Sequence, residues 1–244
     1  MANFLVKISY NGTMFYGFQR QPKYKNTVQE EVETLLSKLL NENITIFGAG
    51  RTDKGVHALN QCFNFHTSKK INIQKLMYAF NRLIGPYINM NSISEVSEDF
   101  HARYYAKTKI YKYRINQGNK DPFNEKTIYQ LNRKLDINEM KEASKLFLGE
   151  HNFKNFTTKE EDTKGHNRNI KDIIIEENND IVDITFIADG FMRYMVRMLV
   201  GTLIKIGLKK IKRDNIKNLL DNPSSVGGVY KAPPEGLYLV DVLY

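Results

Sequence analysis

Apolar residues alternate with polar ones in some stretches of the chain and recur at helical spacing in others. Residues 4–8 alternate, which predicts an opening strand because successive side chains of a strand point to opposite faces. Residues 27–41 carry apolar side chains three and four positions apart, which predicts an amphipathic helix. Thr27 followed by Glu30 is typical of a capping box, so we expect this helix to begin there.

The same two patterns continue to about residue 100. Further strands and one further helix are predicted, the strands at residues 44–47, 61–66 and 89–96 and the helix at residues 73–84. The first part of the chain therefore has the order strand, helix, strand, strand, helix, strand, which is the order of the split ferredoxin-like arrangement.

The second part follows a similar order more loosely. Strands are predicted at residues 107–116, 170–176, 181–187 and 237–243, and helices at residues 137–148, 193–206 and 212–220. A hairpin turn is expected at Asn178-Asn179-Asp180, and the polar residues 149–169 are expected to form a surface loop.

Strands and helices in this mixed order predict an α+β fold with a mainly antiparallel sheet. We expect two ferredoxin-like halves, residues 1–100 and 101–244, with a glycine-rich loop in the first. Their sheets are expected to join into one extended sheet with helices on one face.

Charge suggests a polyanionic partner. Lys and Arg number 36 against 27 Asp and Glu, a net charge of +9. Such an excess favours nucleic acid, although a lysine-rich solvated surface gives the same total. The single cysteine, Cys62, favours a reduced, cytoplasmic setting, and we expect it to be a small buried residue. No signal peptide is evident, and the longest apolar stretch, residues 195–208, is interrupted by charges, so no membrane span is expected.

The glycine-rich loop, residues 48–55, is the most informative segment. It places Asp53 close to Arg51 and beside Lys54, and these cations favour the ionised carboxylate, a ready nucleophile. A loop of this composition is also common turn material, in which the aspartate bonds to nearby amides. Its spacing fits neither a Walker loop nor a dinucleotide fingerprint.

Residues 48–58, Gly-Ala-Gly-Arg-Thr-Asp-Lys-Gly-Val-His-Ala, resemble the signature of the TruA-type tRNA pseudouridine synthases. Other segments are similar to motifs of that family in the same order along the chain: residues 10–13, 16–19, 27–29, 100–103, 111–113, 190–197, 200–203 and 236–239. The chain departs from the family pattern at Asn11, Phe18 and Asn152, which leaves the identity of the RNA target open.

The resemblance implies isomerisation of uridine to pseudouridine in the tRNA anticodon stem-loop, at positions 38 to 40, without cofactor or metal. The target base must leave the stack, and Asp53 is the implied nucleophile, attacking either C1′ of the ribose or C6 of the base. Arg51 is implied to fill the space of the flipped base or to bind a phosphate. Tyr111 is implied to stack on the uracil and help move the C5 proton, Arg197 to pair with Asp53, and Leu237 to form an apolar floor.

Other interpretations of these residues stay open. Tyr111 and Leu237 lie in strand patterns and suit a core, and Arg197 suits a surface position on a helix. The resemblance also implies a homodimer that binds tRNA. Ribosomal RNA as substrate, and a non-catalytic RNA-binding or folding protein, are the alternatives. His151 and His166 give only a weak zinc pattern, and no helix-turn-helix or zinc motif favours a DNA partner.

Overall fold

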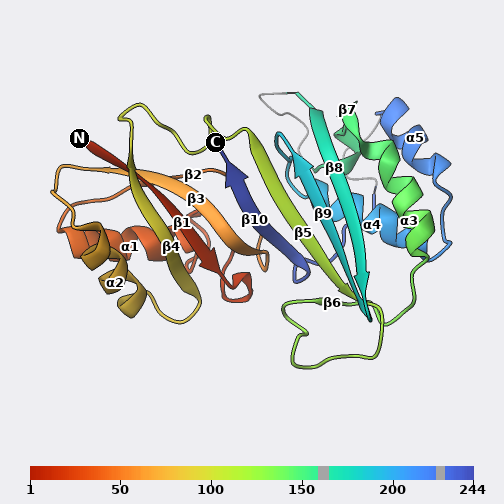
Figure 1. The fold of residues 1–244 in the computed structure, drawn as a ribbon, viewed down its shortest axis with the longest axis horizontal. Coiled ribbons are helices and arrows are strands. Elements are labelled where there is room, and N and C mark those ends of the chain that lie inside the picture. The colour runs from red at the N-terminus through yellow and green to blue at the C-terminus, as the bar shows by residue number, and fades with distance from the viewer. Residues whose placement is uncertain (159–164, 224–228) are drawn as a thin grey trace. The chain divides into compact units, whose positions relative to one another are not determined.

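The computed structural model describes residues 1–158, 165–223 and 229–244, and it confirms an α+β fold with mainly antiparallel strands (Figure 1). Contacts between residues divide the chain into two units. The first unit contains Met1–Lys107 together with Tyr238–Tyr244, and the second contains Thr108–Leu237. These units differ from the halves expected at residue 100 because residues 101–107 and the last strand both pack with the first unit.

The first unit has the element order that the alternating and helical patterns predict. In chain order its elements are β1 (Ala2–Tyr10), α1 (Val28–Leu40), β2 (Ile46–Gly48), β3 (His57–Thr67), α2 (Ile73–Leu83) and β4 (Ile88–Val96). Strand β1 lies between β4 and β3, and β2 pairs with β3, all antiparallel. This is the split arrangement in which the first and third strands are central neighbours.

Burial accounts for the position of β1, and capping accounts for the start of α1. Alternate residues of β1 are buried, as a strand with one covered face requires. The Thr27 side chain accepts a hydrogen bond from the Glu30 backbone N–H at 3.3 Å, which confirms the predicted start of α1. The Glu30 carboxylate accepts from the Asn26 N–H rather than from Thr27, so the capping box closes one residue early.

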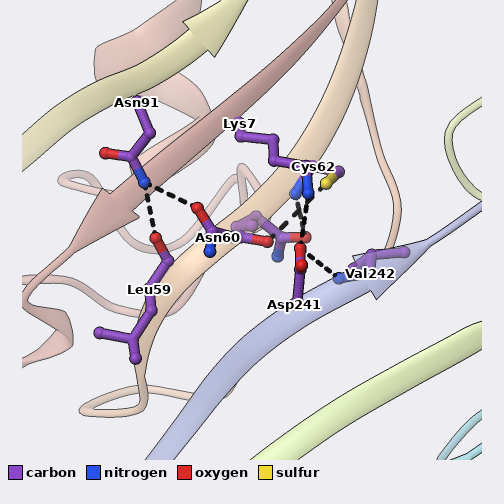
Figure 2. Close-up of polar contacts among 8 residues, drawn as sticks. Lys7, Leu59, Asn60, Cys62, Asn91, Asp241 and Val242 are labelled. Atoms are coloured by element: carbon purple, nitrogen blue, oxygen red, sulfur yellow. Dashed lines mark hydrogen bonds and ion pairs between the residues drawn. The ribbon is translucent and has the colours of Figure 1, made fainter.

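The C-terminal strand β10 (Leu237–Leu243) joins the first unit beside β3. It runs parallel to β3, with Tyr238 opposite His57. Figure 2 shows Lys7 and Asp241 pointing toward each other, and their Nζ and Oδ1 atoms are 2.8 Å apart. On the same sheet the Asn91 amide donates to the Leu59 carbonyl at 2.7 Å. β3 begins at His57, just after the glycine-rich loop, so the start of β10 lies beside the end of that loop.

The second unit is built on an antiparallel sheet in the order β5-β9-β8-β7. Its elements are β5 (Thr108–Asn116), β6 (Tyr129–Gln130), α3 (Ile137–Ser144), β7 (Gly149–Asn152), β8 (Asn167–Asn178), β9 (Ile181–Ala188), α4 (Met195–Gly207) and α5 (Asp214–Asp221). The β8–β9 hairpin turns where the sequence predicts it, and Asn179 takes a φ of 56° there. Asparagine tolerates this left-handed conformation better than most residues.

The expectation that residues 149–169 form a surface loop is wrong for its first part and for its last three residues, which begin β8. Residues 149–152 form β7, which pairs with β8, and Phe153 and Phe156 are fully buried. The Asn155 amide is also buried and donates to the carbonyls of Leu219 and Asn222. The segment is mostly polar in sequence, yet its two phenylalanines, Phe153 and Phe156, are part of the core. Residues 159–164 of the expected loop lie outside the described residues.

Helix α4 is buried along almost its whole length. It is apolar on nearly all sides because it lies within the core of its unit rather than at a surface. In the parts of the chain that the structure describes, no helix is both long enough and apolar enough to span a bilayer.

Candidate active site

The loop between β2 and β3, residues 49–56, carries Asp53, and we call it the Asp53 loop. Its first residues are tied to β3, because the Gln61 side chain donates to the Gly50 carbonyl at 3.0 Å. Its last residues form a tight turn, in which the Val56 N–H donates to the Asp53 carbonyl at 3.1 Å. Gly55 takes a φ of 80° in that turn, a conformation that favours glycine. Asp53 is thus held on a defined backbone and is partly exposed.

Thr52 anchors the centre of the loop. Its side chain is buried and its hydroxyl lies 2.8 Å from the Tyr10 hydroxyl of β1. Burial raises the pKa of Tyr10, so this contact is a neutral hydrogen bond at ordinary pH. The residues on either side are more accessible, with Arg51 exposed and Asp53 partly exposed. The loop therefore presents a cation and a carboxylate to solvent around a buried threonine.

A second loop, which follows β1, packs against the Asp53 loop backbone to backbone. A Cβ on Gly12 would lie only 2.0 Å from the Val56 carbonyl oxygen, so no larger residue fits there without a shift. The Phe18 N–H donates to the Thr52 carbonyl at 3.1 Å. The Gly12 N–H donates to Nδ1 of His57, whose ring stacks on that of Tyr238 with centroids 4.7 Å apart. Three chain segments thus converge on the end of the Asp53 loop.

Tyr111 lies in β5 of the second unit and is 8% exposed. It stands opposite Phe186 of β9 and meets the ring of Phe191 edge to face, with centroids 5.2 Å apart. Tyr113 shares its face of the strand and is fully buried. Tyr111 is therefore largely a core aromatic, and its contact with Phe191 joins it to the segment of residues 190–197.

Arg197 in α4 is only 7% exposed, so the interpretation of it as a surface cation is wrong. Its Nε donates to the Ala232 carbonyl at 2.7 Å, and its guanidinium carbon lies 5.5 Å from the centre of the Tyr194 ring. Arg193 and Lys231 approach the same ring, at 4.8 and 3.9 Å. Cations over an aromatic face are stabilised by its quadrupole, so this cluster keeps several positive charges together.

The residues before β10 lie close to Arg197 in the second unit. Burial raises the pKa of the Glu235 carboxyl, and the positive charge of Arg197 opposes that shift. Burial also raises the pKa of Tyr113, whose hydroxyl donates to the Pro233 carbonyl at 2.8 Å. Leu237 is 4% exposed and its N–H donates to the Pro234 carbonyl at 2.9 Å. Leu237 accordingly packs as a buried residue at the start of the strand.

The predicted site residues fall into two groups. The first unit holds Arg51 and Asp53, and the second holds Tyr111, Arg197 and Leu237. The pairing of Arg197 with Asp53 stays a prediction. In the part of the chain that the structure describes, no three His, Cys, Asp or Glu side chains gather in a way that suits a metal ion.

Two features escaped the sequence patterns. One is the group of cations around Tyr194, which depends on a bend in the chain before α4, where Tyr194 takes a φ of 63°. The other is an exposed pair of stacked tyrosines, Tyr16 and Tyr24, in the loop after β1. The only signal for them in the sequence is that Tyr24 lies between two lysines, Lys23 and Lys25.

Comparison with known proteins gives one consistent family. The family model described as tRNA pseudouridine synthase matches residues 7–105 and 143–244. Proteins named tRNA pseudouridine synthase A from Thermoanaerobacter sp. (strain X514) and Acetivibrio thermocellus are 38% and 39% identical to the chain, each over the full length of both proteins. The protein of that name from Mycoplasma genitalium is 38% identical over all of this chain and 99% of its own length.

A solved structure titled Crystal Structure of a Cbf5-Nop10-Gar1 Complex is similar over 82% of this chain and 45% of that chain, with 12% identity and a TM-score of 0.38.

Proposed function

This chain belongs to the tRNA pseudouridine synthase family, whose members are isomerases that act on tRNA, and we propose that it modifies uridines of the anticodon stem-loop with Asp53 as its nucleophile. The observation that carries the proposal is the Asp53 loop. It holds a partly exposed carboxylate between a buried threonine and a glycine turn, with cations on both sides. A nucleophile needs this combination of fixed position and access.

The reaction in this proposal is an isomerisation. The uridine leaves the RNA stack, its C1′–N1 bond breaks, the uracil rotates and a C1′–C5 bond forms; C5 then loses its proton to solvent and N1 takes up a proton from solvent. Reactant and product contain the same atoms and electrons, so no co-reactant is consumed. The Asp53 carboxylate adds to C1′ or to C6 and is released at the end. Arg51 and Lys54 stabilise its negative charge and attract the phosphates beside the target.

The other predicted residues have supporting roles in the proposal. Arg51 is exposed, and its planar guanidinium suits both the gap left by a flipped base and a phosphate. Tyr111 faces the uracil, Leu237 forms an apolar surface beneath it, and Arg197 holds the Asp53 carboxylate. We also propose that the protein works in the cytoplasm as a homodimer, in which one subunit holds the body of the tRNA that the other modifies.

Mapping pseudouridine in RNA from cells that lack the gene tests the substrate. We expect pseudouridine to disappear from the anticodon stem-loops of several tRNAs and to return when the gene is restored. Unchanged tRNA with sites missing from ribosomal RNA would favour the alternative substrate. No loss from either RNA would favour a binding protein without catalysis.

Tyr111→Phe is expected to lower turnover about 100-fold, because it removes the hydroxyl that helps move the C5 proton while it keeps the aromatic ring. The ring still meets Phe191, so the melting temperature is expected to stay within a few degrees of that of the native protein. Single-turnover rates on unmodified tRNA, with thermal melting as the control, measure this. Turnover within twofold of the native rate would identify the hydroxyl as dispensable and leave Tyr111 a core or stacking residue.

RNA binding is expected to depend steeply on salt, because Lys and Arg side chains that neutralise phosphates release counterions. Exposed cations follow α4 at Lys209, Lys210, Lys212 and Arg213. Binding of unmodified tRNA is expected to weaken about 1000-fold between roughly 50 and 200 mM salt. Lys210→Gln is expected to reduce the slope of log Kd against log salt by about one. Affinity that barely changes over this range would contradict a phosphate-binding surface.

A further inference from the structure

Tyr16 and Tyr24 form a stacked pair on the surface of the first unit. Their ring centroids are 4.9 Å apart with an angle of 9° between the planes, and each residue is 40% exposed. Lys54 Nζ lies 4.3 Å from the centre of the Tyr16 ring, and Lys23 Nζ lies 5.6 Å from that of Tyr24. Aromatic rings that pack for stability are normally buried, so an exposed parallel pair flanked by cations calls for another explanation.

The pair is fixed relative to the proposed nucleophile. Lys54, which approaches the Tyr16 ring, is the residue after Asp53. A Cβ on Gly17, the residue after Tyr16, would lie 2.7 Å from the Thr52 carbonyl oxygen, so the two backbones are in close contact. The tyrosine pair and the Asp53 loop therefore belong to one local structure.

The loop that carries the pair has its own hydrogen bonds. The Tyr16 N–H donates to the Asn26 carbonyl at 3.1 Å, and the Gln21 amide donates to the Tyr16 carbonyl at 3.1 Å. The Asn26 amide donates to the Met14 carbonyl at 2.6 Å. Because backbone contacts close this loop, the rings are not needed to hold its ends together, and Tyr24 is available for another role.

The charge of the same loop suits RNA. Between residues 11 and 29 there are three cations, Arg20, Lys23 and Lys25, and no Asp or Glu. Of these, Arg20 pairs with Glu33, whereas Lys23 and Lys25 are exposed on either side of Tyr24. Proteins recognise unpaired RNA through aromatic rings that stack on bases and cations that contact the adjoining phosphates.

We propose that the Tyr16–Tyr24 pair is a stacking platform for an unpaired base of the substrate tRNA, close to the uridine that reacts. The base stacks on the face of the Tyr24 ring that is turned away from Tyr16, where it takes the place of the Lys23 ammonium, and Lys23 and Lys25 contact the phosphates of that nucleotide and its neighbour. The platform holds the strand beside Asp53 while the target uridine leaves the stack. This inference rests on the proposed function only in that tRNA is the RNA bound.

The test measures binding of an unmodified tRNA transcript to variants that also carry Asp53→Ala, so that no turnover occurs. Tyr24→Leu is expected to weaken binding about tenfold, the loss of one stacked base, while Tyr24→Phe binds like the parent. The slope of log Kd against log salt is expected to stay the same in Tyr24→Leu, since no charge is removed, and to fall by about one in Lys23→Gln. The control is Tyr78→Leu, which removes a tyrosine on α2 that is 70% exposed, and it is expected to leave binding unchanged.

Binding by Tyr24→Leu within twofold of the parent would overturn the platform, and so would an equal loss in Tyr24→Phe. Tyr24→Trp controls for loss of binding caused by a disturbed loop. Its larger ring is expected to bind the RNA at least as tightly as tyrosine does. A tenfold loss of binding in Tyr24→Trp would also overturn the inference. If the native protein leaves tRNA unmodified but Tyr24→Leu still weakens binding, the platform stands and the proposed reaction fails. If modification is normal and all Tyr24 variants bind equally, the reaction stands and the platform fails.

Discussion

Asp53→Ala is expected to reduce pseudouridine formation by at least about 10⁴-fold, the scale seen when a covalent nucleophile is removed. In the proposed reaction the Asp53 carboxylate forms a bond to the uridine and is later released, and no neighbouring residue of the Asp53 loop, Arg51, Thr52 or Lys54, supplies a second carboxylate. Release of tritium from tRNA that contains 5-tritiated uridine measures turnover directly, because the C5 hydrogen is lost as the new bond forms.

Binding separates a chemical defect from a folding defect in this variant. Asp53 is partly exposed and its loop is held by Thr52 and Gln61, so Asp53→Ala is expected to fold normally and bind tRNA within a few fold of the native protein. Asp172→Ala, which removes an exposed aspartate from β8, is the matched control and is expected to keep full turnover. Turnover by Asp53→Ala near the native rate would show that another group attacks the uridine.

Gly12→Ala is expected to lower the free energy of unfolding by about 1–3 kcal/mol, as overpacking against rigid neighbours does. The added methyl group would lie 2.0 Å from the Val56 carbonyl oxygen, and a backbone atom cannot move aside as a flexible side chain does. Urea unfolding measures the change. Gly190→Ala is the control, since a Cβ at Gly190 meets nothing within 4 Å, and it is expected to change stability by less than about 0.5 kcal/mol.

The same substitution is expected to lower turnover even at temperatures where the protein stays folded. Val56 closes the turn that begins at Asp53, so a shift of its carbonyl moves the carboxylate. A displacement of about 1 Å at a reacting group costs on the order of 100-fold in rate. If Gly12→Ala is as stable and as active as the native protein, the contact between the two loops does not position Asp53.

The spacing of apolar residues predicted much of the fold, because most strands alternate and most helices carry apolar residues at helical spacing. The order of the first unit and the bounds of β10 follow from alternation and helical spacing. The α1 cap at Thr27 was also predictable, because a cap needs only neighbouring residues. Strand β7 was not, because its residues are polar and show no alternation, and it forms only by pairing with β8.

The sequence predicts the chemistry of the candidate site but not the contacts that support it. The loop residues and the family motifs predict Asp53 as the nucleophile, whereas the residues that hold its loop in place are far away in the sequence. Tyr10 reaches Thr52 across 42 residues, and β10 lies beside the first residues of β3, far away in the sequence. The spacing of apolar residues along the chain does not predict contacts between segments so far apart in sequence. The burial of Arg197 and the stacking of Tyr16 on Tyr24 likewise depend on contacts that form only in the folded chain.

The most direct test of the proposed reaction is pseudouridine mapping on unmodified tRNA transcripts incubated with the purified native protein and, in parallel, with Asp53→Ala. We predict new pseudouridines in the anticodon stem-loop with the native protein and none with the variant. Transcripts that stay unmodified with the native protein, or that are modified equally by both proteins, would contradict the central claim that this chain isomerises tRNA uridines through Asp53.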